Sequence, residues 1–167
     1  MSIQAFVDFL SLEKKYASNT VLAYQRDLKV FQIFLASECE ISDLKLAHYT
    51  QIRRWITLLV DGGLSNRSIN RKISALNSFY KFLVKTGTLK TSPLAKHKAL
   101  KVKKKIHIPF SIKEVAAVLN TKTEDSFEAV RNLLILELLY STGMRRAELI
   151  NLKISDIDFH LHQLKVL

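Results

Sequence analysis

Hydrophobic residues recur at steps of three and four through the first half of the chain, which is the period of amphipathic α-helices. The segment after Ser18 is one example, because Val21, Tyr24, Leu28 and Phe31 share one face there. The pattern predicts helices over about residues 2–14, 18–37, 47–60 and 65–87. Four short amphipathic helices of this kind predict a small helical bundle.

The pattern changes over residues 88–110, which show no clear period and contain both prolines of the chain. We expect a linker between two domains there. Helical periodicity then returns, and Ser111 with Glu114 matches the capping box that begins many helices. From Ile157 onward apolar and polar residues alternate, which predicts a strand or the start of a hairpin, with no partner and no closing turn in the sequence. Helices are predicted over about residues 111–120, 124–142 and 145–152.

These elements predict a mainly α protein with two domains. We expect a four-helix bundle over residues 1–87, a basic linker over residues 88–110, and an incomplete second domain of helices and a strand over residues 111–167. With one cysteine, Cys39, the chain has no internal disulfide and suits the reducing cytoplasm. Its scattered histidines predict no metal site, and no cofactor is expected. No apolar run approaches the ~20 residues that cross a membrane, so no membrane partner is expected.

The net charge of the chain, and its distribution along the sequence, indicate the class of molecule that the protein binds. The chain has 26 Lys and Arg against 15 Asp and Glu, a net charge of +11. Between Gly62 and Lys113 there are 13 basic residues and no acidic one. A solvated surface usually mixes the two signs, so this distribution favours a nucleic-acid binder over a basic surface that only keeps the protein soluble.

The fourth predicted helix concentrates this charge on one face. Steps of three and four align basic residues with small hydroxyls, while Ile69, Ile73 and Leu76 belong to a second, apolar stripe. Small hydroxyls let a helix approach phosphates closely. We expect DNA contact rather than only a solvated face. The candidate DNA-binding residues of this helix are Arg67, Ser68, Arg71, Lys72, Ser74, Ser78, Lys81 and Lys85.

Two other segments are weaker candidates for DNA contact. The start of the second helix offers Asn19, Thr20 and Arg26, whereas Tyr24 beside them is expected to pack in the core. The linker offers the run Lys103, Lys104 and Lys105. That run is either a solvated tether or a segment that becomes ordered on DNA.

The stretch LLYSTGMRRAEL, residues 138–149, predicts a corner between two helices. The leucine-rich helix before it is expected to be buried, and Gly143 suits a left-handed cap at its end. Arg145 and Arg146 then lie in a first helical turn, where the helix dipole disfavours cations unless an anion binds. Glu148 can orient one of the arginines. Simple exposure of both arginines is an equally good interpretation.

The same stretch resembles the segment of tyrosine recombinases (phage integrases, Xer-like branch) with the pattern L-Y-x-T-G-[LM]-R-x-x-E-L. The first half of the chain also resembles this family. Its segments SNTVLAYQRDLKVFQIFL and LSNRSINRKISALNSFYKFL resemble two helices of tyrosine recombinases. The resemblance implies a SAM-like core-binding bundle followed by the start of a catalytic domain. It implies a site-specific recombinase or integrase that clamps duplex DNA and rejoins strands through a 3′-phosphotyrosine, without metal.

By position, the resemblance makes Arg145 the first catalytic arginine and Glu148 a supporting acid, while Arg146 falls on a variable position. The family's catalytic lysine, His-x-x-Arg motif, second His or Trp, and nucleophilic tyrosine have no counterpart in this sequence. Tyr140 is expected to pack in a core rather than to act as nucleophile. We therefore expect the chain to bind DNA without cleaving it, and a full-length protein to act as a homo- or hetero-tetramer.

Two alternatives remain at this point. One is a complete DNA-binding protein without catalytic activity, such as a truncated paralogue that occupies recombination sites. The other is a helical RNA-binding module, because a basic face alone does not distinguish the two kinds of duplex.

Overall fold

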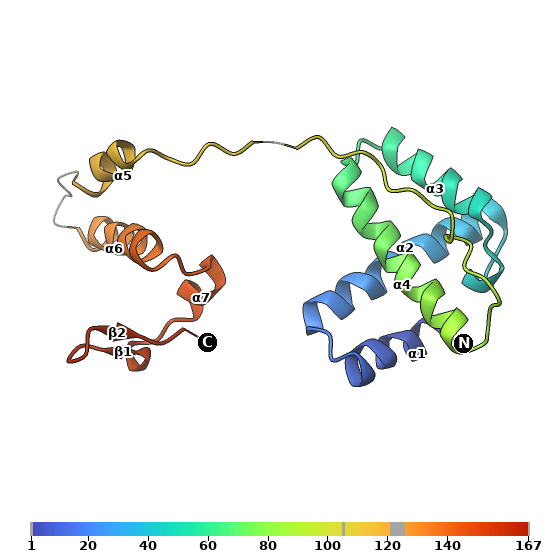
Figure 1. Cartoon of the computed structure of the whole chain (residues 1–167), viewed down its shortest axis with the longest axis horizontal. Helices are drawn as coiled ribbons and strands as arrows, with labels where there is room; N and C mark the ends of the chain where they lie inside the picture. Colours follow the sequence, from blue (N-terminus) through green and yellow to red (C-terminus); the bar gives the residue numbers. More distant parts are fainter. Residues whose placement is uncertain (1, 105, 121–125, 167) are drawn as a thin grey trace. The chain divides into compact units, whose positions relative to one another are not determined.

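The computed structural model describes residues 2–104, 106–120 and 126–166. The chain divides into two compact units, Met1–Lys104 and Lys105–Leu167, which are described separately below. The first unit is helical, and Figure 1 shows its helices in blue to green. Its elements are α1 (Ile3–Asp8), the π-helix η1 (Phe9–Glu13), α2 (Ser18–Cys39), the 3-10 helix η2 (Leu44–Leu46), α3 (Tyr49–Asp61) and α4 (Asn66–Lys85).

The helix boundaries in the first unit follow local capping chemistry. The Ser65 hydroxyl accepts the Ser68 N–H at 3.2 Å, which begins α4 where the sequence predicts it. Gly63 has a φ of 78°, which ends α3 in the left-handed conformation that glycine adopts without strain. The first predicted helix is instead divided into α1 and a π-turn, in which the Lys14 N–H bonds the Phe9 carbonyl. A 3.6-residue period does not reveal that wider turn.

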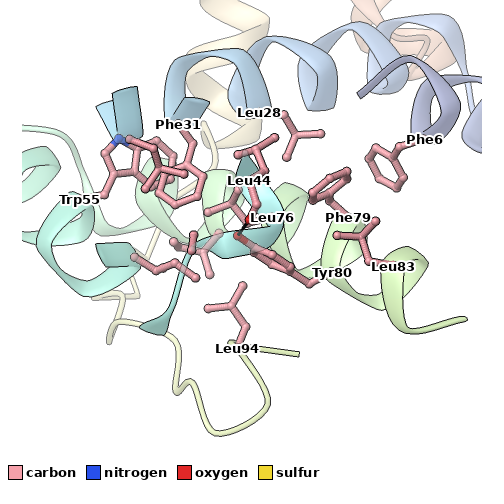
Figure 2. Packing of buried hydrophobic residues seen from close by; sticks show 14 of the residues in the cluster. Phe6, Leu28, Phe31, Leu44, Trp55, Leu76, Phe79, Tyr80, Leu83 and Leu94 are labelled. Carbon is pink, nitrogen blue, oxygen red and sulfur yellow. Dashed lines mark hydrogen bonds between the residues drawn. The ribbon is translucent and has the colours of Figure 1, made fainter. Parts of the chain in front are cut away.

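The core of the first unit combines aromatic and aliphatic side chains, and α4 contributes Leu76, Phe79, Tyr80 and Leu83 to it, as Figure 2 shows. Phe6 meets Phe79 edge-on, with ring centroids 5.4 Å apart, and Phe31 packs against Trp55 at 4.8 Å. The hydroxyl of Tyr80, fully buried, donates a hydrogen bond of 2.9 Å to the Leu44 carbonyl. The α4 side chains therefore join α1 and η2 into one bundle.

The expected linker does not begin at residue 88. Leu94 is buried in the core of the bundle. Asn70 of α4 bonds both backbone groups of Leu100, with Nδ2 donating to the carbonyl at 2.8 Å and Oδ1 accepting the N–H at 2.9 Å. Asn66 donates to the Lys101 carbonyl at 2.8 Å. Residues 88–101, here called the strap, thus belong to the first unit, because backbone groups bonded by α4 side chains hold them there.

The second unit contains α5 (Ile112–Leu119), α6 (Phe127–Thr142), α7 (Arg146–Asn151), the 3-10 helix η3 (Ile154–Asp156), β1 (Ile157–Asp158) and β2 (Gln163–Leu164). The capping box predicted at Ser111 and Glu114 is present, and Figure 1 shows the α5 helix that it begins in gold. The predicted strand is not without a partner. β1 pairs antiparallel with β2, and the Asp158 carboxylate accepts the N–H groups of His160 and Leu161 in the turn between them.

The prediction that α6 is buried is wrong for the residues that the structure describes. No described residue of α6 is buried, and Leu134 and Tyr140 are 53% and 57% exposed. α6 contacts α5 and α7, which cover only part of its apolar surface. An apolar groove of about 650 Å³ lies between α5 and α6. Tyr140 lines that groove rather than a closed core.

Candidate nucleic-acid interface and arginine corner

The basic face of α4 is exposed along its length. Arg67, Arg71, Ser74, Lys81 and Lys85 are exposed, whereas the apolar stripe of the helix is buried. The Ser74 hydroxyl donates to the Asn70 carbonyl one turn earlier, at 2.9 Å, which leaves its oxygen lone pairs free to accept. The helix therefore presents cations and small hydroxyls together, as the sequence predicts.

One carboxylate reaches this face from α2. Asp27 is 1% exposed, and its Oδ2 lies 2.8 Å from Nη1 of Arg71. Nη2 of Arg71 donates to Oδ1 at 3.1 Å, and Nζ of Lys72 lies 2.9 Å from the same oxygen. Two candidate DNA contacts thus balance a buried negative charge. The signal in the sequence is Asp27 itself, a charged residue three positions after Tyr24 in an apolar stripe.

The carboxyl-terminal half of α4 borders a hollow of about 400 Å³. Tyr24 of α2 lines it and is partly buried against the core, in agreement with the expectation for that residue. Lys85 lies on its rim, 3.6 Å from Glu13 and 5.0 Å above the ring of Phe9. The hollow is also lined by Lys14, Tyr16, Ser74, Asn77, Ser78, Lys81 and Phe82.

The other candidates lie at the edges of this surface. Asn19 and Arg26 of α2 are exposed and Thr20 is partly exposed. Ser68 lies beside the α4 cap, its hydroxyl 3.0 Å from that of Ser65. Lys103 and Lys104 are exposed just after the strap, whereas Lys105 lies outside the described residues. The strap residue Lys101 is fixed to the first turn of α4 by Asn66, and this lysine run starts two residues after it.

The corner between α6 and α7 is formed as the sequence predicts. Gly143 caps α6 with a φ of 64°, and its N–H bonds the Leu139 carbonyl at 3.1 Å. Met144 is buried, and Arg145 is the N-cap of α7 rather than a residue of its first turn. Arg145 lies directly before the free N–H groups of α7, with its side chain 85% exposed.

Glu148 orients one arginine and not the other. Its carboxylate accepts the backbone N–H of Arg145 at 2.6 Å and the Nη1 hydrogen bond at 2.8 Å. These two hydrogen bonds hold the pKa of Glu148 below its ordinary value, and the bond from the backbone N–H has the larger effect. Arg146 is exposed and has no ion pair among the described residues. The geometry thus separates the two adjacent arginines.

Within the described ranges, no group of three His, Cys, Asp or Glu side chains could hold a metal ion. The helices of that part of the chain are also too short or too polar to span a bilayer. The sequence did not single out Asp27, which pairs with two cations of this surface, or Asn66 and Asn70, which hold the strap.

Comparison with known proteins agrees with this architecture. The phage integrase N-terminal SAM-like domain matches residues 3–87, and the phage integrase family matches residues 109–166. The chain is 36% identical over 166 residues to tyrosine recombinase XerC of Pediococcus pentosaceus, covering 99% of this chain and 55% of that protein. It is 36% identical over 156 residues to tyrosine recombinase XerD of Rickettsia prowazekii, covering 93% and 50%. The chain thus spans about half the length of the curated relatives it matches.

Solved structures show the same fold. The Tn1549 transposon integrase in complex with transposon right end DNA gives a TM-score of 0.67 at 18% identity, over 96% of this chain and 50% of that one. The integrase from mycobacterium phage Brujita gives 0.53 at 18% identity, over 98% and 53%. The expected SAM-like bundle is therefore confirmed. Since family models match both units, the chain belongs to the phage integrase family of tyrosine recombinases.

Proposed function

We propose that this chain is the DNA-binding portion of a site-specific recombinase that breaks and rejoins strands through a 3′-phosphotyrosine. The observation that carries the proposal is the exposed α4 face, where cations alternate with hydroxyls and no acidic residue occurs between Gly62 and Lys113. Cations neutralise phosphates and release counterions, while small hydroxyls hydrogen-bond the same backbone.

The bound DNA is double-stranded in this proposal. A single exposed helix with a cationic face fits a major groove about 12 Å wide, whereas the deep groove of duplex RNA is too narrow for it. The Tn1549 integrase, whose fold this chain shares, is described in complex with transposon DNA. Asn19, Thr20 and Arg26 of α2 and Lys103 and Lys104 after the strap extend the contact surface on either side.

Arg145 supplies charge to the scissile phosphate. Glu148 holds the guanidinium of Arg145 by one Nη1 hydrogen bond, and the remaining donors stay exposed. An oriented guanidinium stabilises the negative charge on the non-bridging oxygens of a phosphate whose phosphorus is under attack. The nucleophile and the other catalytic groups have no matching positions in this sequence, so the chain itself binds without cleaving. In the whole protein, we propose a tetramer on paired sites.

DNA binding is tested by fluorescence anisotropy of a labelled 30-base-pair duplex titrated with the chain at 50 to 200 mM salt. We expect affinity to fall steeply with salt, and Arg67→Ala with Lys81→Ala to lower the slope of log K against log salt by about 1.8, or 0.9 per lost phosphate contact. The matched control is Arg53→Ala, which removes an exposed charge from α3. Absence of binding, or equal effects of the control, would overturn the proposal.

Cleavage is tested separately with a pool of nicked duplexes of randomised sequence. A covalent protein–DNA adduct survives denaturing electrophoresis, whereas a non-covalent complex does not. We expect a complex on the native gel and no adduct on the denaturing gel. A denaturation-resistant adduct would show that the chain cleaves DNA.

A further inference from the structure

The adjacent cations Arg71 and Lys72 are used differently by the fold. Both contact the carboxylate of Asp27. The Lys72 side chain is 15% exposed, so its ammonium is largely withdrawn from the surface. The Arg71 side chain is 51% exposed although its guanidinium meets both carboxylate oxygens. Only one of the two cations can therefore reach a ligand.

The carboxylate of Asp27 has two cationic partners. A buried charge is tolerated only when it is paired and hydrogen-bonded, and one cation alone would balance the carboxylate and leave no excess charge. With Lys72 also bonded to Oδ1, the three side chains carry a net charge of +1. That excess charge lies at the exposed member, Arg71.

The guanidinium of Arg71 keeps donors to spare. Arginine has five N–H donors in a rigid plane. One of them, on Nη2, donates to Oδ1 of Asp27, while Nη1 lies 2.8 Å from Oδ2. No other partner of this guanidinium occurs among residues 2–104, 106–120 and 126–166. A plane fixed on one edge by a carboxylate and free on the others suits a phosphate oxygen.

We propose that Asp27 is a positioning residue for DNA binding, which holds Arg71 in the orientation that meets a phosphate, while Lys72 balances the Asp27 charge and does not contact DNA. This inference rests on the proposed function. It goes further by assigning opposite roles to neighbouring lysine and arginine side chains, and a DNA-binding role to a buried acid that repels DNA.

The decisive variant is Asp27→Asn in the whole chain, measured with the same anisotropy assay. The substitution raises the net charge by one, so charge alone predicts tighter binding of DNA. If the carboxylate orients Arg71, its loss should instead weaken DNA binding about tenfold. A tenfold change in affinity corresponds to the loss of one charge-assisted hydrogen bond. Circular dichroism and the fluorescence of buried Trp55 establish that the variant is folded. Equal or tighter binding by the folded variant would overturn the inference.

A second pair of variants decides the matter if Asp27→Asn does not fold. Lys72→Gln keeps a donor for Asp27 and leaves the guanidinium of Arg71 in place, so it should lower the salt slope less than Arg71→Gln, which should lower it by about 0.9. Equal effects of the two would contradict the inference. The wild-type chain separates the two proposals: if it does not bind duplex DNA, the proposed function fails, and if it binds while Arg71→Gln changes nothing, only this inference fails.

Discussion

The carboxylate of Glu148 bonds both the backbone N–H and the guanidinium of Arg145, at 2.6 and 2.8 Å. One acidic side chain thus caps α7 and orients the arginine before it. The two tasks are separable, because the backbone bond does not depend on the side chain at position 145.

The pKa of Glu148 should report this pairing. Hydrogen bonds to the ionised form lower the pKa of Glu148 below 4.5, so their stabilisation is present at neutral pH and lost as pH falls through the folded-state value. In Arg145→Ala the backbone bond survives, and we expect the pKa to rise only part of the way. Carboxyl NMR titration measures both values. An unchanged pKa in Arg145→Ala would show that the guanidinium does not hold Glu148 in solution.

Removal of the Tyr80 hydroxyl should destabilise the bundle without disturbing its packing. Tyr80→Phe keeps the ring but removes one of the two donors of the Leu44 carbonyl, which then keeps only the Ala47 N–H at 3.3 Å. We expect a loss of about 1–2 kcal/mol, and a Tm lower by about 5–10 °C. Thermal unfolding followed by circular dichroism measures the shift. Tyr16→Phe is the control, since Tyr16 is 43% exposed; equal shifts would mean that the buried bond contributes nothing.

The strap should loosen when its side-chain anchor is removed. Asn70→Ala deletes both hydrogen bonds to Leu100, with an expected cost of about 1–3 kcal/mol. Limited trypsin digestion should then cleave faster after Lys96 and Lys98, which are exposed in the strap. Asn77→Ala, on the same helix, should leave the cleavage rate near that of the wild type. Equal protection in both variants would show that the Asn70 hydrogen bonds are not needed to hold the strap.

His97 should make the bundle less stable in mild acid. Burial lowers the pKa of His97 below 6.5, so the unfolded chain binds a proton that the folded chain binds less readily. Stability is therefore unaffected above that value and falls as pH decreases below it. Urea unfolding followed by Trp55 fluorescence should show a lower midpoint at pH 5.5 than at pH 7.5. The difference should shrink in His97→Gln; if it does not, another group is responsible.

Local features of this fold follow from short stretches of sequence. Ser65, Ser111 and Gly143 cap their helices through hydrogen bonds to residues that are only three or four positions away. The residue types at these positions are therefore enough to predict the helix ends. The α4 faces follow from spacing in the same way.

Relationships between distant residues could not be predicted. Asp27 meets Arg71 across 44 positions and Asn70 meets Leu100 across 30, and no periodicity encodes such pairs. Leucine content predicts that α6 is apolar, but not whether another element covers it. A test of DNA contact by Arg71→Glu would also place a second carboxylate beside Asp27 and disrupt the fold, which the sequence alone does not reveal.

The buried position of Leu94 has a practical consequence for dividing this protein. A fragment that stops at residue 87, where the SAM-like match ends, lacks the strap and uncovers the apolar surface that Leu94 fills. Such a fragment would be prone to self-association during purification, and its weak DNA binding would be mistaken for a property of the bundle. A cut after Lys104 keeps the bundle whole and retains two of the three lysines that follow the strap.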